Sequence, residues 1–295
     1  MAISLKVIRA FGNEAHDAAE LRLLYELYEE AQRGRIAHGE RLRAILQGRS
    51  VALQPSVSGD AGVVLKAIGR GESAGAPALL ERAYTRAMSD EACAAEALRE
   101  AIERHAAWPW CSGVKGVGHL LAARLLSRLD VSRAKTPSAF WAYCGLGTIP
   151  GIAYRCSECG LEVGYPVGYE PRNAHRSLLG TRYCVGNLGI IRGVQARVAP
   201  RRATLGGRSG YDAHARGACY LIGVSMLRCG SDYRSIYDAE RARLASLRPG
   251  WTPKRCHLSA LRKMEKAFLR DLWVAWRRAL GMPVVPAYFP HLSEA

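Results

Sequence analysis

Several features are missing from this chain, and each absence excludes a class of protein. The 295-residue sequence has no apolar run long enough to cross a bilayer, and residues 1–5 lack the basic start of a secretion signal. It contains no G-x-x-x-x-G-K-[ST] phosphate loop and no G-x-G-x-x-G within a βαβ pattern. Its acidic residues form no clustered motif of the kind that binds catalytic Mg²⁺. We therefore expect a cytoplasmic protein without a membrane partner and without a nucleotide-binding α/β domain.

The cysteines do not favour a disulfide framework. There are nine, an odd number, and they are scattered through a chain that lacks the signs of secretion. Disulfides are rare in the reducing cytosol. Most of these cysteines are therefore expected to be small buried hydrophobic residues.

Positive charge is concentrated in one part of the chain. The net charge is +16, and the predicted isoelectric point is about 9.7. Residues 1–110 carry 14 Lys and Arg against 15 Asp and Glu, whereas residues 111–295 carry 28 against 11. A basic surface kept only for solubility would be spread more evenly. The split, together with the predominance of arginine, favours a polyanionic partner such as a nucleic acid.

Length and composition permit two or three packed units, because 49% of the residues are hydrophobic. Residues 1–107 predict a helical arm, with one helix from about Asn13 to Leu46 and a second from Pro77 to about Ala107. The apolar stripe of the first helix comprises Leu21, Leu24, Tyr25 and Tyr28, and the core candidates of the second are Leu79, Leu80, Tyr84, Met88, Leu98 and Ile102. We expect Trp108-Pro109 to end the second helix. Such an arm could also pair two copies of the chain into a homodimer.

The remaining chain divides into three predicted regions: a helix-hairpin-helix (108–150), a β-like insert (151–191) and a basic helical region (192–295). In the last region, an apolar stripe marks one helix, Tyr237 to Leu244 marks a shorter one, and Thr252-Pro253 begins a long helix that ends near Gly281. The fold class is therefore mainly α, with a helix-hairpin-helix core and a small zinc-knuckle β insert. The predicted apolar stripe comprises Tyr220, Leu221, Val224 and Leu227.

Residues 113–118 read as a glycine hairpin that opens directly into a helix. Gly116 and Gly118 allow positive φ and leave backbone N–H groups uncovered. The start of the following helix adds unpaired N–H donors and the positive end of its dipole, which suit a phosphate. This pattern is typical of a helix-hairpin-helix that grips nucleic-acid backbone without reading bases. The expected contact residues are Gly113, Lys115, Gly116, Gly118 and Arg124.

A C-x-x-C-G zinc knuckle begins at Cys156 and continues with Cys159. Two thiolates at this spacing can chelate one tetrahedral ion. A second C-x-x-C is absent, and the nearest further ligands are His175 and Cys184, which give C-x2-C-x15-H-x8-C. Cys144 is the alternative to His175 as the fourth ligand. A redox C-x-x-C is the other interpretation, although that motif requires a strand–motif–helix setting.

Two further groups of cations follow the knuckle. A run of cations like the first group can be a solvated loop. Together with the hairpin, however, it favours a basic strip that tracks a phosphate backbone. Trp273 and Trp276 are better explained as core residues than as base-stacking platforms. Ser209-Gly210 could present a nucleophilic serine beside these arginines, whereas an ordinary turn is the alternative. The first group comprises Arg192, Arg197, Arg201, Arg202, Arg208 and Arg216. The second comprises Lys263, Lys266, Arg270 and Arg277, which share one face of the last predicted helix.

Two blocks of the sequence resemble the C-terminal domain of the bridge-RNA-guided insertion-sequence transposases. Residues 113–118 with Ala122-Ala123, followed by Phe140 to Leu146, resemble that family's G-[IV]-G-x-x-x-A hairpin and its Gly-Leu element, and residues 220–228 resemble the helix after its catalytic serine. The resemblance covers roughly residues 108–150 and 205–230. It implies DNA binding and a mobile-element origin. The family's ribonuclease-H-like N-terminal half differs from the helical pattern of residues 1–107.

These observations predict a nucleoid-associated DNA-binding protein with largely sequence-independent affinity and a structural zinc ion. A transposase or recombinase that uses Ser209 is the first alternative. An RNA-binding or scaffold protein is the second.

Overall fold

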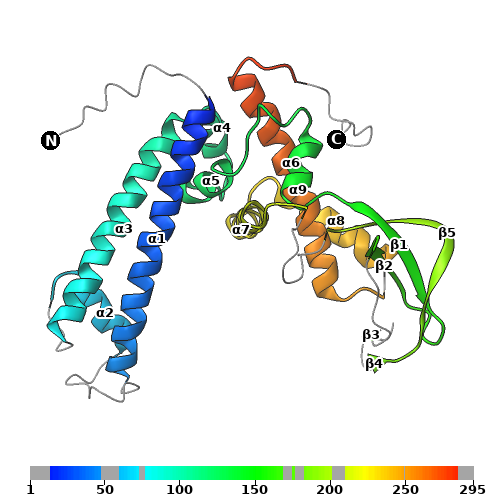
Figure 1. The fold of residues 1–295 in the computed structure, drawn as a ribbon, viewed down its shortest axis with the longest axis horizontal. Helices are drawn as coiled ribbons and strands as arrows, with labels where there is room; N and C mark the ends of the chain where they lie inside the picture. The colour runs from blue at the N-terminus through cyan, green and yellow to red at the C-terminus, as the bar shows by residue number, and fades with distance from the viewer. Residues whose placement is uncertain are drawn as a thin grey trace. The chain divides into compact units, whose positions relative to one another are not determined.

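A computed structural model describes residues 14–47, 60–72, 77–168, 175–176, 183–200, 210–248 and 250–284. The fold is mainly α-helical with a small antiparallel β insert, which confirms the predicted class (Figure 1). The chain forms two compact units: residues 1–105 with 122–127, and residues 106–121 with 128–295. Across the described ranges, none of the helices combines the length and the apolar character needed to cross a bilayer.

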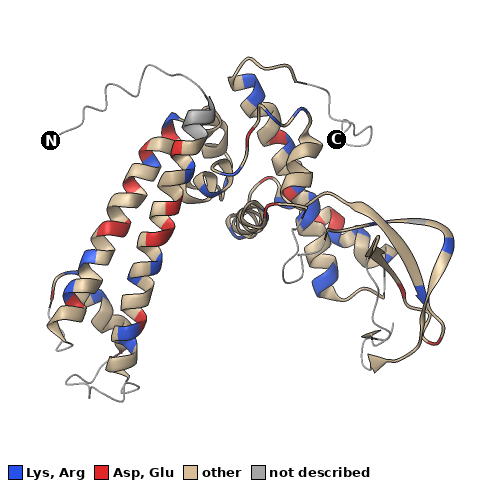
Figure 2. Ribbon diagram, viewed as in Figure 1, with Lys and Arg blue, Asp and Glu red and all other residues tan. Residues whose placement is uncertain are grey.

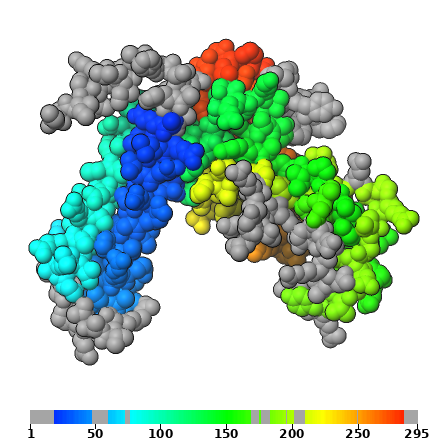
Figure 3. Space-filling view, viewed as in Figure 1, coloured from blue at the N-terminus to red at the C-terminus, as the bar shows by residue number. Residues whose placement is uncertain are grey.

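The first unit is built on two long helices, α1 (Glu14–Leu46) and α3 (Ala78–Arg104), which lie side by side (Figures 1 and 3). The predicted stripe on α1 is buried at Leu21, Tyr25 and Tyr28. Gln32 of α1 donates a hydrogen bond to Glu91 of α3 at 3.2 Å. A hydrophobic cluster joins the two helices to α2 (Ala61–Gly69) through Leu42, Leu46, Val64, Leu65, Ile68 and Tyr84.

Three expectations for this arm need correction. Helix α2 was not predicted, although Asp60 caps it by accepting from the Gly62 N–H at 2.7 Å. Helix α3 ends at Arg104, and Trp108-Pro109 begins a helix instead of ending one, because proline is tolerated in a first turn. Leu79, expected in the core, is 72% exposed.

The second unit contains the other helices of the described chain. Thr252 caps the last of them by accepting from the Arg255 N–H at 3.3 Å, and Gly281, at φ +64°, follows its end, as predicted. The helices are α4 (Trp108–Ser112), α5 (His119–Leu126, of which residues 122–126 belong to the first unit), α6 (Pro137–Tyr143), α7 (Ala213–Cys229), α8 (Arg234–Leu247) and α9 (Pro253–Ala279).

Helix α9 provides the core of this unit. Its Phe268 packs against Trp110 of α4, with ring centroids 5.5 Å apart, and its Trp276 packs against Phe140 of α6 at 6.2 Å. The fully buried Trp273 donates from Nε1 to the Ala134 carbonyl at 2.7 Å. The prediction that Trp273 and Trp276 are core residues is confirmed.

Helix α7 buries a different face from the one predicted. Tyr220 and Leu221 are 46% and 39% exposed, and the buried face carries smaller residues. Small residues let α7 approach α9 closely: a Cβ on Gly223 would lie 2.9 Å from Leu261 Cδ1. The prediction followed the largest apolar side chains, whereas the close approach to α9 buries a face on which small residues accompany Ile222 and Met226. The buried residues are Ala215, Ala218, Cys219, Ile222, Gly223 and Met226.

The β insert consists of a three-stranded antiparallel sheet and a short ribbon. The sheet has the order β2-β1-β5, with β1 at Ile149–Cys156, β2 at Glu162–Pro166 and β5 at Leu188–Val198. The ribbon pairs β3 (His175–Arg176) with β4 (Tyr183–Cys184), so that His175 lies opposite Cys184. Strand β5 therefore contains the first two arginines of the predicted basic strip.

Candidate functional site

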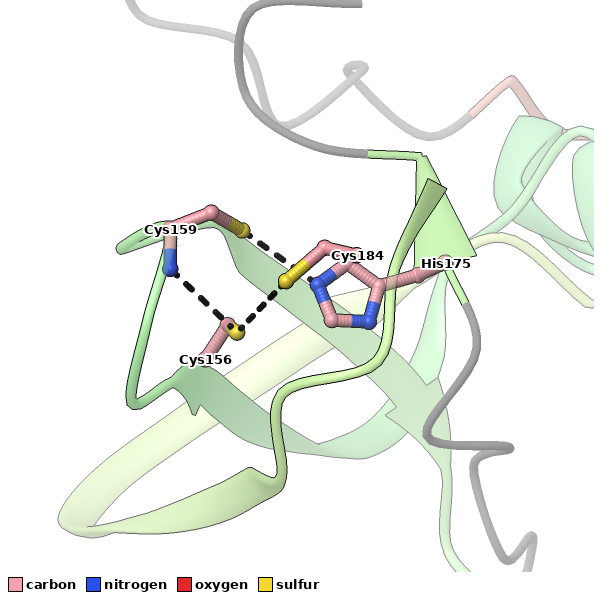
Figure 4. Close-up of side chains that lie close together, drawn as sticks. All are labelled: Cys156, Cys159, His175 and Cys184. Carbon is pink, nitrogen blue, oxygen red and sulfur yellow. Dashed lines mark hydrogen bonds between the residues drawn. The ribbon is translucent and has the colours of Figure 1, made fainter. Parts of the chain in front are cut away.

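Three sulfurs and one imidazole converge in the β insert (Figure 4). Cys156 ends β1, Cys159 lies in the turn before β2, and the β3–β4 ribbon provides His175 and Cys184. Their ligand atoms all lie within 4.8 Å of one another. Cys156 Sγ is 3.7 Å from Cys184 Sγ, and Cys159 Sγ is 3.3 Å from His175 Nε2. The four predicted ligands are thus brought together.

Local backbone geometry explains why these residues form a knuckle. The Cys159 N–H donates to Cys156 Sγ at 3.5 Å, and the Gly186 N–H donates to Cys184 Sγ at 3.4 Å. Gly160 follows at φ +68°. Gly186 is needed for a different reason, since a Cβ there would lie 2.8 Å from Cys156 Sγ. Sequence reasoning missed Gly186, although the Cys-x-Gly spacing from Cys184 is a visible signal.

The donor set fits a tetrahedral metal ion. A Zn²⁺–S distance of about 2.3 Å places two sulfurs of a tetrahedron roughly 3.8 Å apart, close to the observed 3.7 Å. Cys144, the alternative ligand, is fully buried at the end of α6 and is not in the group. The C-x-x-C lies between two strands, with no helix after it, so the setting of a redox motif is missing.

The glycine hairpin joins α4 to α5, and its glycines have different roles. Gly116 adopts φ +92°, and a Cβ there would lie 2.9 Å from the Met226 backbone N of α7. Gly116 is therefore required for packing the hairpin against α7. Gly118 and Gly113 do not have positive φ, which corrects that expectation for Gly118. An added Cβ on Gly118 would meet nothing within 4 Å.

One side of this hairpin is an open pocket. It is lined by the hairpin residues 114–118, the first turn of α5 and Ser225 of α7. Lys115 is exposed there and forms no ion pair with the described residues. Among the described residues, no carbonyl accepts a hydrogen bond from the backbone N–H of Lys115, Gly116 or Gly118. The pocket is therefore lined by one exposed positive charge and by residues whose backbone N–H groups have no carbonyl partner among the described residues.

Arg124 has a different environment from the rest of the expected interface. In the first unit its guanidinium lies 4.0 Å from the Glu29 carboxylate, and its Nε is buried without a hydrogen-bond partner. The same arginine lowers the pKa of Tyr25, although burial outweighs it and raises that pKa overall. Arg124 is therefore part of the helical arm's packing.

The predicted basic strip is divided by the structure. Arg192 is exposed on β5, whereas Arg197 donates to the Thr148 carbonyl and hydroxyl, each at 2.9 Å. Arg201, Arg202, Arg208 and Ser209 lie outside the described residues. Arg216 stacks over the Tyr211 ring at 5.0 Å.

The cations of α9 have partners of different kinds. Lys263 pairs with Glu240 of α8 at 2.7 Å, and Arg270 pairs with Asp271 at 2.7 Å. Lys266 Nζ lies 4.6 Å from the centroid of the Trp141 ring. Arg277 is buried, donating to the carbonyls of Pro283, Val131 and Ala134, so it does not belong to an exposed basic face.

A groove of about 350 Å³ lies between α8 and α9, with Trp141 of α6 at its wall. Its lining includes Arg262 and Arg243, which sequence reasoning did not select, besides the predicted Lys263, Lys266 and Arg270. Arg262 lies one helical turn before Lys266, and this spacing is the signal that could have identified Arg262 from the sequence. We call this the α8–α9 groove.

Glu265 of α9 is buried and lies close enough to Arg262, which lines the groove, to interact with it electrostatically. Desolvation raises the pKa of Glu265 to about 8, against the opposing effect of Arg262 and Arg216. Its carboxyl is therefore mostly protonated at neutral pH and does little to neutralise Arg262.

No protein-family model matches the chain, and comparisons with curated proteins and with solved structures found no similar protein.

Proposed function

We propose that this protein binds DNA by its phosphate backbone, with the glycine hairpin as the central contact. The observation that carries the proposal is the open pocket at residues 114–121, which is lined by the exposed Lys115 and by residues whose backbone N–H groups donate to no carbonyl of the described chain. Backbone amides and a mobile ammonium are complementary to phosphate oxygens, and they read no base edges. Affinity would therefore depend little on sequence.

The charge distribution supports a polyanionic partner. Residues 111–295 hold 28 Lys and Arg against 11 Asp and Glu. In Figure 2 blue and red residues are mixed along α1 and α3, whereas blue residues predominate over red ones along α9. On this proposal, Lys115 and the exposed Arg192 contact phosphates, and the arm of the first unit serves another purpose, such as pairing two chains.

In this proposal the Cys₃His group holds a structural zinc ion. All four positions of the tetrahedron would be filled by the protein, which is typical of a structural site, since catalytic zinc sites keep one position open. The ion would tie the β3–β4 ribbon to the end of β1 and so position the arginine-bearing β5.

A salt titration tests DNA binding. The affinity of the purified protein for two 20-bp duplexes of unrelated sequence is measured from 50 to 300 mM salt. Both duplexes should bind equally, with log K falling linearly with log salt, by about 0.9 for each phosphate neutralised. Absence of binding, or affinity that does not change with salt, would refute the proposal. A structured RNA in the same titration tests the RNA-binding alternative, which would be favoured if RNA bound more tightly.

Two variants locate the contact. Gly118→Val places a side chain in open space at the hairpin, so it should fold normally and weaken DNA binding by about tenfold or more. Lys115→Glu should weaken binding and reduce the salt slope by about 1. Lys135→Glu, an equal charge change at another exposed position, is the matched control. Equal losses in all three variants would remove the hairpin from the proposal.

One observation favours the transposase alternative enough to keep it. The two blocks that resemble the transposase domain pack together: the Asp212 N–H donates to the Tyr143 carbonyl at 2.8 Å, and a Cβ on Gly145 would lie 2.8 Å from the Tyr211 ring. Ser209 precedes this contact by two residues in the sequence. Covalent trapping of the protein on nicked DNA, lost in Ser209→Ala, would support strand cleavage; the absence of trapping in the wild type would oppose it.

A further inference from the structure

The α8–α9 groove contains more positive charge than its own carboxylates neutralise. Glu240 is shared by Arg243, at 2.6 Å, and Lys263, at 2.7 Å, and these contacts lower the pKa of Glu240 to about 2. Asp271 pairs with Arg270 and also accepts from Tyr233 Oη at 2.7 Å. The carboxylates of Glu240 and Asp271 are therefore already engaged.

Arg262 and Lys266 are left without a counter-ion. Arg262 donates one hydrogen bond, to the Gly145 carbonyl at 2.8 Å, and forms no ion pair with the described residues. Lys266 contacts the Trp141 face and donates to no oxygen of the described residues. Burial lowers the pKa of the Lys266 ammonium, and the charge of Arg262 lowers it further. The nearby Glu265 is mostly protonated at neutral pH.

Two half-buried cations one helical turn apart repel each other, and an anion placed between them removes that repulsion. We propose that Arg262 and Lys266 form a phosphate-binding site in the α8–α9 groove, separate from the glycine hairpin. The groove volume of about 350 Å³ lies at the small end of the range for ligand pockets, about 300–1,000 Å³, which suits one phosphate with its sugar. The occupant is a phosphate group of a nucleic-acid strand, and this part of the inference rests on the proposed function.

The test uses inorganic pyrophosphate as the probe and the indole N–H resonance of Trp141 as the reporter. Trp141 Nε1 donates to the Lys266 carbonyl at 2.9 Å, so its resonance should respond to an anion bound beside Lys266. The full-length wild type should give a saturable shift. Lys266→Met keeps the apolar stem over the ring and should bind pyrophosphate at least tenfold more weakly. Lys266→Arg, which keeps the charge, should stay within about threefold of the wild type.

Lys263→Met is the matched control, because Lys263 lies in the same groove but is already paired with Glu240. It should change pyrophosphate affinity by less than about threefold. Equal weakening in Lys263→Met and Lys266→Met, or no saturable shift in the wild type, would overturn the site. If Lys266→Met does not fold, loss of binding in Lys266→Arg would overturn it as well.

Duplex DNA with and without 5′-phosphates distinguishes the source of the phosphate. Weaker binding of both duplexes by Lys266→Met supports an internal phosphodiester, and weaker binding of the phosphorylated duplex alone assigns the site to a strand terminus. Unchanged affinity for both would refute the nucleic-acid occupant. Gly118→Val should leave pyrophosphate binding unchanged, so failure of the hairpin proposal and failure of the groove proposal give different results.

Discussion

Removing the metal ion should unfold the β insert and leave the helical parts intact. Among the described residues of the insert, the buried hydrophobic side chains are Tyr154 and Cys156. Burying a large side chain contributes about 3 kcal/mol at most, whereas ordering each backbone residue costs about 1–2 kcal/mol. The three sheet strands contain 8, 5 and 11 residues. Burial of these two side chains therefore cannot offset the entropy cost of ordering the three strands of the sheet.

The structural zinc ion of the proposed function would supply the missing free energy. Apparent binding free energies of about 10–16 kcal/mol are typical for structural zinc at neutral pH, and they become folding free energy when the apo site is unfolded. The four ligands join β1, the following turn and the β3–β4 ribbon, so loss of the ion releases every strand end near the site.

The assay combines metal analysis with ¹H–¹⁵N spectra. We expect one zinc ion per chain, and chelation should remove the dispersed resonances of β1, β2 and β5 while those of α9 persist. Cys184→Ser should reproduce this result without a chelator, whereas Cys93→Ser, at an exposed position outside the cluster, should not. A sheet that keeps its dispersed resonances after complete metal removal would refute the reasoning.

Three further predictions concern the helical parts of the molecule. Gly116→Ala should lower the free energy of unfolding by about 2 kcal/mol or more, because of its φ of +92° and the Met226 backbone 2.9 Å away, while Gly118→Ala should change it by less than about 0.5 kcal/mol in the same urea titration. Equal effects of the two would contradict the packing role. Because burial raises the pKa of Glu265 to about 8, the unfolded chain loses this proton first, and the free energy of unfolding should fall between about pH 5 and pH 8, by up to about 1.4 kcal/mol per pH unit; Glu265→Gln should lack this component, and an identical pH profile would show that Glu265 is not buried as described. Arg277→Ala should cost about 1–3 kcal/mol in thermal or urea unfolding, since the buried Val131 carbonyl loses its guanidinium donor and the Ala134 carbonyl keeps only Trp273, whereas the neighbouring exposed Arg278→Ala should cost less than about 0.5 kcal/mol; similar losses would argue against the buried network.

The metal ligands could be predicted because their chemistry is local. Cys156 and Cys159 are close in sequence, and Gly160 marks the knuckle turn. His175 and Cys184 could be selected as the nearest ligands, but the β3–β4 pairing that places them opposite each other is a tertiary feature. Residue spacing restricts the choice of ligands, whereas strand register decides it.

The exposed cations were harder to predict because periodicity shows which residues share a helix face but not which side chains they contact. Lys263 and Lys266 share the predicted basic face of α9, yet one is neutralised by Glu240 and the other lies over Trp141. Arg277 belongs to the same predicted face and is buried. These differences depend on α8, α6 and the loop before α6, which are distant from α9 in sequence.

The helix-hairpin-helix interpretation combined two roles that the structure separates. Sequence reasoning gave Gly116 and Gly118 the same role, because both can adopt positive φ. Gly116 uses this freedom to pack against α7, while Gly118 faces open space. Only Gly118 can therefore be substituted to test ligand binding without disturbing the fold.

The most direct test of the account is the salt dependence of duplex DNA binding by the wild type and Gly118→Val, measured side by side with their unfolding curves. We predict steeply salt-dependent binding by the wild type and binding about tenfold or more weaker for Gly118→Val, with unfolding curves that coincide. Equal affinities in two equally stable proteins would contradict the assignment of the hairpin as the DNA contact.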